Sequence, residues 1–101
     1  MILAIDFDGV VHDHKNPIKG RRMGAPIEGA KEVVNELKLR GNKIIIHSVW
    51  AGNPQVIKDW MEFYGILFDE ITDKKPQADI YLDDKAVRFT SWQDFKNHMG
   101  I

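Results

Sequence analysis

The sequence predicts an α/β protein with a doubly wound, mostly parallel sheet of about five strands and helices on both faces. Short apolar runs of strand length alternate with longer segments in which apolar residues recur every three or four positions. Polar side chains follow the apolar runs directly, as Asp6 and Asp8 follow the run that begins at Ile2. The 101 residues leave room for a single domain, 1–101, with a modest core.

The first half of the chain supplies the opening strand, a helix and a second strand. The opening strand runs from Ile2 to Asp6. A helix is expected to begin at Pro26, because apolar side chains follow at helical spacing until Gly41 provides a stop signal. Lys43–Ser48 is rich in β-branched residues and too short for a helix, so it predicts a second buried strand.

The second half repeats this alternation and closes with a helix. Asn53 and Pro54 are typical of a helix start, and Gly65 is typical of a helix end. The remaining elements are a third strand at a sheet edge, a fourth strand, a short fifth strand and a last helix, expected over 66–71, 79–82, 87–90 and 91–98.

The segment 10–24 is polar and contains proline and glycine, which predicts a loop or short hairpin that overhangs the first strand like a flap. Its only acid is Asp13, against four cations, Lys15, Lys19, Arg21 and Arg22. Arg21 and Arg22 are therefore candidates to bind an anionic substrate, and an ordinary solvated loop is the alternative. The whole chain has a formal charge of −1, so any preference for anions must be local.

Carboxylates gather where the predicted strands end. Asp6 and Asp8 are two residues apart on an extended chain, so they point to the same side and can converge on one cation or reacting group. Asp83 and Asp84 follow the fourth strand, and the carboxyl ends of parallel strands meet at one edge. Oxygen ligands in a chain without cysteine favour Mg²⁺. Taken alone, Asp6 and Asp8 are also consistent with a polar turn.

A hydroxyl and two lysines accompany these carboxylates. Ser48 ends the second strand, and His47 before it is expected to pack or form a hydrogen bond beside that strand, near a bound substrate. Lys74 and Lys75 precede the fourth strand. Pro76 keeps Lys75 extended, and either lysine could be the site lysine, with Lys74 as the alternative beside the substrate.

These features resemble the four motifs of the haloacid dehalogenase (HAD) superfamily of phosphohydrolases, in the same order: Asp6 and Asp8, then Ser48, then Lys75, then Asp83 and Asp84. The intervals that hold a cap domain in other members are short here, so the chain is similar to a small capless member. The resemblance implies the strand order 3-2-1-4-5, with the first strand central. It also implies a Mg²⁺ site made by Asp6, the backbone carbonyl of Asp8 and Asp83, supported by Asp84.

The resemblance further implies a magnesium-dependent phosphomonoester hydrolase. Asp6 would attack phosphorus and form an aspartyl-phosphate, and Asp8 would protonate the leaving oxygen and then activate water. Lys75 would offset the negative charge that meets there, and Ser48 would hold a phosphoryl oxygen. The substrate would be a phosphorylated small molecule or the phosphorylated end of a polymer.

Two other functions remain consistent with the sequence. A phosphorylation-controlled receiver domain also combines carboxylates, Mg²⁺, a hydroxyl and a lysine, although its acceptor aspartate ends the third strand. A protein that binds Mg²⁺ or phosphate without turnover is the second alternative. The chain lacks cysteine and any apolar run of membrane length, so we expect a cytoplasmic protein without a membrane partner.

Overall fold

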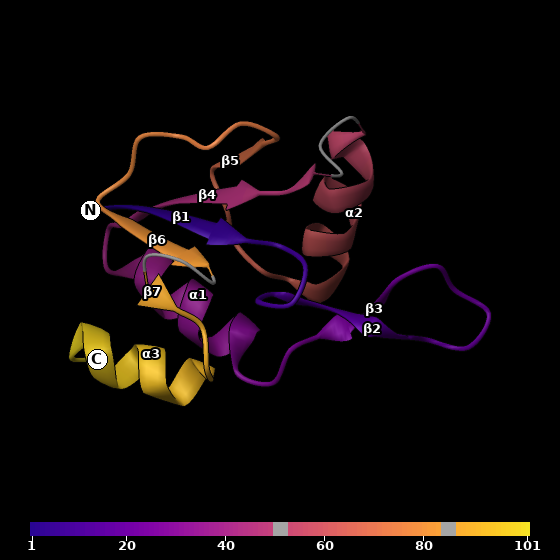
Figure 1. Cartoon of the computed structure of the whole chain (residues 1–101), viewed down its shortest axis with the longest axis horizontal. Helices are drawn as coiled ribbons and strands as arrows, with labels where there is room; N and C mark the ends of the chain where they lie inside the picture. Colours follow the sequence, from indigo (N-terminus) through magenta and orange to yellow (C-terminus); the bar gives the residue numbers. More distant parts are fainter. Residues whose placement is uncertain (50–52, 84–86) are drawn as a thin grey trace.

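Strands and helices alternate along most of the chain. The computed structural model describes residues 1–49, 53–83 and 87–101. Its elements are β1 (Ile2–Asp6), β2 (His12–Pro17), β3 (Gly24–Pro26), α1 (Ala30–Leu39), β4 (Lys43–His47), α2 (Pro54–Tyr64), β5 (Glu70–Thr72), β6 (Ile80–Asp83), β7 (Val87–Arg88) and α3 (Trp92–Met99) (Figure 1). None of the helices in these ranges has the length and apolar character needed to cross a membrane.

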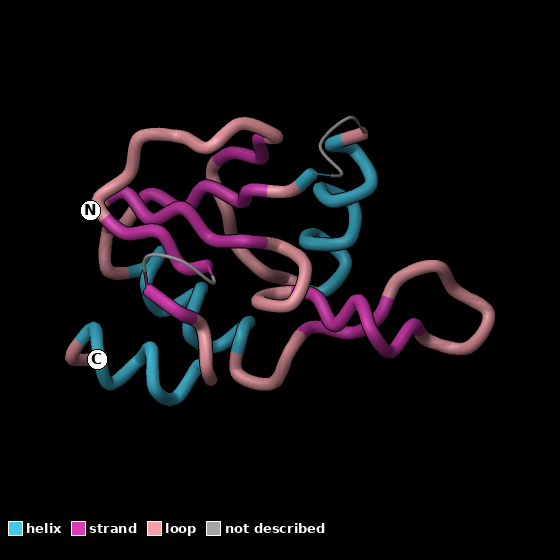
Figure 2. The backbone as a smooth tube through the Cα atoms, in the orientation of Figure 1, coloured by secondary structure: helices cyan, strands magenta, loops and turns pink. Residues whose placement is uncertain are grey.

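The main sheet has five strands in the order β5-β4-β1-β6-β7, and its neighbouring strands pair in parallel. Numbered along the chain without the hairpin, this is the predicted order 3-2-1-4-5, with β1 at the centre. A separate antiparallel pair, β2 and β3, forms a hairpin over 12–26, which extends two residues beyond the predicted segment 10–24. Figure 2 shows the hairpin standing away from the body of the protein, beyond the end of β1.

The two faces of the sheet differ in what covers them. Leu3 and Ile5 of β1 point to one face, as do their partners Ile44 and Ile46 on β4. These four side chains are fully buried in one core with apolar residues from all three helices. Ala4, between Leu3 and Ile5, points to the opposite face, which the helices do not cover.

The prediction of helices on both faces is therefore wrong for the described part of the chain. α1 and α2 cross from β1 to β4 and from β4 to β5 in the same direction, so right-handed crossovers place them on one face. α3 packs beside α1, where Trp92 lies against Gly29. The link 73–79 between β5 and β6 is too short for a crossover helix, and it lies over the opposite face as a loop (Figure 1).

Two predicted boundaries are also wrong. Pro26 belongs to β3 instead of starting a helix, and α1 begins at Ala30 after Gly29, whose φ of 87° only glycine adopts readily. The third strand begins at Glu70 instead of at Ile66, because the chain from Ile66 first packs under the end of α2. Apolar periodicity identified both elements but not the residues where they begin.

The C-terminal end of α2 and the N-terminal start of α3 lie where the sequence predicts them. α2 ends at Gly65 in the left-handed conformation, with φ of 70°. α3 begins after Ser91, whose hydroxyl accepts a hydrogen bond from the N–H of Asp94 at 3.1 Å. At these two positions the local signals in the sequence predicted where the helix stops or starts.

Candidate functional site

A cavity of about 170 Å³ lies on the face of the sheet that the helices leave uncovered. Its lining residues come from β1, β4, β6 and the 73–79 loop: Ala4, Asp6, His47, Lys75, Pro76, Tyr81 and Asp83. β1, β4 and β6 are neighbours, and Asp6, His47 and Asp83 each stand at the last position of a strand. The structure therefore brings together three of the predicted acidic and basic site residues, Asp6, Lys75 and Asp83, with His47 beside them.

Asp6 forms a pair with His47 across the junction of β1 and β4. The two residues are partners in the parallel register, so their side chains lie on the same face. One carboxylate oxygen of Asp6, Oδ1, lies 3.1 Å from Nδ1 of His47. Both side chains keep part of their surface open to solvent. His47 thus forms the hydrogen bond beside the strand that the sequence predicts, and its partner is the leading carboxylate.

Lys75 brings positive charge to the opposite wall of the cavity. Its Nζ lies 3.8 Å from Oδ2 of Asp83 and 4.8 Å from the centre of the Tyr81 ring. The hydroxyl of Tyr81 donates to the carbonyl of Pro76 at 2.7 Å and accepts from the N–H of Ala78 at 3.0 Å. Tyr81 therefore fixes the loop that presents Lys75 to the carboxylates.

Asp8 lies just beyond β1, where its side chain contacts His12 instead of lining this cavity. Its Oδ1 lies 2.7 Å from Nδ1 of His12, and the N–H of Gly24 donates to Nε2 of the same ring at 2.9 Å. Gly9, with φ of 81°, provides the tight turn that brings His12 back towards Asp8. One oxygen of Asp8 is thereby held, and its other oxygen has no part in that bond.

Two other predicted residues, Ser48 and Lys74, are not part of the cavity lining. Ser48 is buried, and its N–H donates to the carbonyl of Thr72 at 3.0 Å, which ties β4 to β5. Lys74 is exposed and does not line the cavity, so the geometry favours Lys75 as the site lysine. Asp84 lies outside the described residues. The expected contact of Ser48 with a phosphoryl oxygen stays a prediction.

The arginines of the hairpin line a different depression. Arg21 and Arg22 border a groove of about 410 Å³ against α2, together with Trp60 and Phe63. The guanidinium of Arg21 lies 5.6 Å from the centre of the Phe63 ring. Their predicted role in substrate binding would therefore concern a part of the substrate that extends beyond the small cavity.

Two residues that shape the site, His12 and Tyr81, were not among the predicted site residues. His12 is four positions after Asp8, but only the turn after β1 makes them neighbours. Tyr81 carries a detectable signal, because it is two positions before Asp83 on the same strand and must share its face. Strand alternation could have identified Tyr81, whereas His12 required the geometry of the turn.

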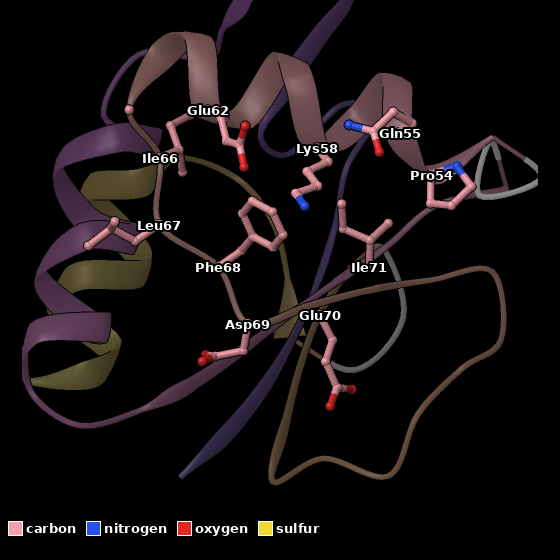
Figure 3. Close-up of a pocket in the computed structure, with 11 residues that line it drawn as sticks. Pro54, Gln55, Lys58, Glu62, Ile66, Leu67, Phe68, Asp69, Glu70 and Ile71 are labelled. Atoms are coloured by element: carbon pink, nitrogen blue, oxygen red, sulfur yellow. The ribbon is translucent and has the colours of Figure 1, made fainter.

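A larger groove of about 740 Å³ runs between α2 and β5. Figure 3 shows its walls, with Lys58 and Gln55 on α2 facing Phe68 and Ile71 across it. The carboxylates at the end of β1 are not part of its lining. The larger groove also has charged walls, but we assign the site to the smaller cavity, because the predicted residues Asp6, Lys75 and Asp83 converge there at the ends of neighbouring strands.

Comparisons with known proteins extend this description of the fold. No protein-family model matches the chain, and no curated protein matches it. A solved structure of a conserved protein from Bacteroides thetaiotaomicron is similar over 99% of this chain and 89% of its own, with a TM-score of 0.81 and 25% sequence identity. Its description names no activity, so the similarity concerns the fold, and the function must be argued from the site.

Proposed function

We propose that this chain is a HAD-type, magnesium-dependent phosphomonoester hydrolase that works through an aspartyl-phosphate on Asp6. The observation that carries the proposal is the convergence of Asp6, Lys75 and Asp83 in one cavity at the end of the central strand. Asp8 follows Asp6 at the distance the four-motif resemblance requires. The larger groove also contains a cation and three carboxylates, Lys58, Glu62, Asp69 and Glu70, but none of them belongs to the four motifs.

The residues present fit Mg²⁺. The described residues contain no group of three or more His, Cys, Asp or Glu side chains arranged around one point. Mg²⁺ does not require such a group, because it keeps several waters and usually binds one or two carboxylates together with substrate phosphate. Asp6 and Asp83 would hold it, with the backbone carbonyl of Asp8. Bound there, the ion would offset the charge of the phosphoryl group and polarise its oxygens.

The protein groups have distinct tasks in the proposed reaction. A carboxylate oxygen of Asp6 attacks phosphorus, the bond from phosphorus to the leaving oxygen breaks, and Asp8 gives that oxygen its proton. Asp8, now a carboxylate, then takes a proton from water as the water oxygen attacks phosphorus. The bond to Asp6 breaks, and inorganic phosphate and a free Asp6 carboxylate result. Lys75 reduces the repulsion between Asp6 and the phosphoryl group in both steps.

The openness of the cavity favours an anionic, phosphorylated substrate of which only one end enters. Lys75 is exposed over about half of its side chain surface, 55%, so part of its charge faces solvent. The cavity of about 170 Å³ has room for a phosphoryl group and little more. The remainder of a phosphorylated sugar, nucleotide or polymer end would lie outside, towards the basic hairpin.

The test is phosphate release from an aryl phosphate by the wild type and by Asp6→Asn, with Mg²⁺ and with a chelator. We expect release by the wild type only with Mg²⁺, and a loss on the order of 10⁴-fold or more in the variant, because the nucleophile is gone. Asp13→Asn, at a half-buried position of the hairpin that does not line the cavity, is the matched control and should keep full activity.

Equal rates for wild type and Asp6→Asn would contradict the proposal. If both proteins are inactive while Mg²⁺ still binds in calorimetry, a binding protein without turnover replaces the hydrolase.

A further inference from the structure

His12 is buried, and contacts with its ring and its backbone hold it in one orientation. The residue as a whole is 5% exposed, and its ring stacks on Phe7, with ring centroids 4.9 Å apart and planes 16° apart. Trp60 packs its edge against the same ring, at 5.3 Å between centroids. The backbone N–H of His12 donates to the carbonyl of Phe7 at 2.8 Å, and its carbonyl accepts from Gly9 at 2.9 Å. Neither the ring nor its backbone is free to turn.

The hydrogen bonds of the ring determine which nitrogen carries the proton. The N–H of Gly24 can only donate, so Nε2 of His12, 2.9 Å away, must be the nitrogen without a proton. The proton of the neutral ring is therefore on Nδ1, which lies 2.7 Å from Oδ1 of Asp8. The result is an N–H group pointed at one chosen oxygen of Asp8.

The Gly24 peptide that sets this arrangement is itself fixed from both sides. Its N–H binds His12, and its carbonyl accepts from Nε1 of Trp60 at 3.0 Å. A side chain at this position would overlap the backbone carbonyl of Asp13, so only glycine fits. Asp8, His12, Gly24 and Trp60 thus form one chain of hydrogen bonds that runs from the end of β1 to α2.

We infer that His12 is a positioning residue that presents the Oδ2 atom of Asp8 to the leaving oxygen of a phosphomonoester. This inference rests on the proposed hydrolase function. Since Oδ1 accepts the Nδ1 proton of His12, the proton that Asp8 donates must be on Oδ2. In the second step the same oxygen faces the attacking water. His12 does not touch the substrate, and it acts through the orientation of Asp8.

The consequence depends on the leaving group. An alkoxide leaves poorly unless it is protonated as the bond to phosphorus breaks, whereas dinitrophenolate leaves without a proton. Misplacing Asp8 should therefore slow the first step with an alkyl phosphate and spare it with dinitrophenyl phosphate. General damage to the fold would slow both substrates alike.

Two variants of His12 separate positioning from packing. In His12→Asn the amide nitrogen occupies the place of Nδ1 and can still donate to Asp8. In His12→Gln the amide reaches the place of Nε2 and can still accept from Gly24, but the donor to Asp8 is lost. His98→Asn, exposed on α3, is the matched control. The single-turnover rate of leaving-group release isolates the first step for each protein.

With glycerol phosphate we expect His12→Gln to lose about 10- to 100-fold and His12→Asn to lose less than about fivefold. With dinitrophenyl phosphate both should stay within about threefold of the wild type. Nitrogen chemical shifts from NMR should show the ring of wild-type His12 with its proton on Nδ1, a readout independent of turnover.

The inference would be overturned by equal losses on the two substrates, or by a His12→Gln protein that is more active than His12→Asn on glycerol phosphate. A proton found on Nε2 of wild-type His12 would overturn it as well. In these cases an active wild type leaves the hydrolase proposal standing. A wild type inactive on both substrates with Mg²⁺ would overturn the two together.

Discussion

Two aspartate–histidine pairs stand at the end of β1, and they are built in opposite ways. Asp6 pairs with His47 at 3.1 Å, with side chains 35% and 27% exposed. Asp8 pairs with His12 at 2.7 Å, with side chains 25% and 7% exposed. The first pair joins neighbouring strands and stays open to the cavity. The second pair is made within one turn, and packed rings surround its histidine.

The difference shows that one strand end can hold an open carboxylate, Asp6, and a carboxylate fixed by a buried histidine, Asp8. A nucleophile must reach phosphorus, so an exposed carboxylate with a loosely held neighbour suits Asp6. An acid and base must keep one direction through two steps, so a carboxylate with one oxygen committed to a buried donor suits Asp8. The amino acids of the two pairs are the same, and their different surroundings suit them to the two proposed tasks.

The strongest way to break the Asp8 pair without touching either member is Gly24→Ala. The new methyl group would overlap the carbonyl of Asp13, so the hairpin must shift and Gly24 must leave His12. We expect the free energy of unfolding to fall by about 1–3 kcal/mol. Turnover of an alkyl phosphate should fall more than turnover of dinitrophenyl phosphate. Chemical denaturation and the two rate assays measure these effects.

Gly20→Asn is the control for that substitution. Gly20 lies on the same hairpin with φ of 78°, nothing lies near its missing side chain, and asparagine tolerates this backbone conformation. The control should keep wild-type stability and rates. A Gly24→Ala protein as stable as the control would contradict the tight packing described for this turn.

The open pair should be far less sensitive. For His47→Ala we expect kcat/KM to fall by about tenfold or less, because His47 makes a partly solvated hydrogen bond to Asp6. The free energy of unfolding should change by less than about 0.5 kcal/mol. Steady-state kinetics and denaturation test both values. A loss as large as that of His12→Gln would remove the distinction between the two pairs.

A third carboxylate, Asp69, is expected to contribute to stability and not to activity. Burial raises its pKa, but two hydrogen bonds, from Lys38 at 2.7 Å and from the N–H of Ile44 at 2.8 Å, lower it. The charges of Lys38 and Lys43 lower it as well, and together these effects outweigh burial, so the pKa lies below the usual aspartate value. Because the unfolded chain binds the proton more tightly, this stabilisation is full above about pH 4 and is lost as the pH falls through the folded pKa.

For Asp69→Asn we therefore expect a lower Tm than the wild type at pH 7, a smaller difference at pH 3, and unchanged turnover. Thermal unfolding at the two pH values and one rate assay measure this. A Tm difference that does not shrink at low pH would show that the carboxylate charge is not the source of the stabilisation.

Much of the fold followed from the sequence for simple reasons. Apolar runs of strand length identified β1, β4 and β6, and the rule that parallel strands end at one edge placed Asp6 near Asp83. The prediction of helices on both faces is wrong because the link 73–79 is too short to contain a crossover helix. Apolar spacing cannot tell which face of a sheet a helix covers.

The parts of the site that could not be predicted depend on turns. The neighbourhood of Asp8 and His12 follows from one glycine turn and from a peptide that is twelve residues further along the hairpin. The position of Arg21 beside Phe63 depends on how the hairpin packs against α2. Strand and helix patterns contain no information about either contact.

The central claim is that Asp6 carries the phosphoryl group, and Asp8→Asn offers the most direct measurement. Asparagine can still accept from His12, so the fold should be kept, but it cannot activate water. With Mg²⁺ and dinitrophenyl phosphate the first step should proceed and the second should stall. Acid quenching followed by peptide mass spectrometry should then find a phosphoryl group on Asp6. An active wild type whose Asp8→Asn variant shows no adduct, or an adduct on another residue, would contradict the account.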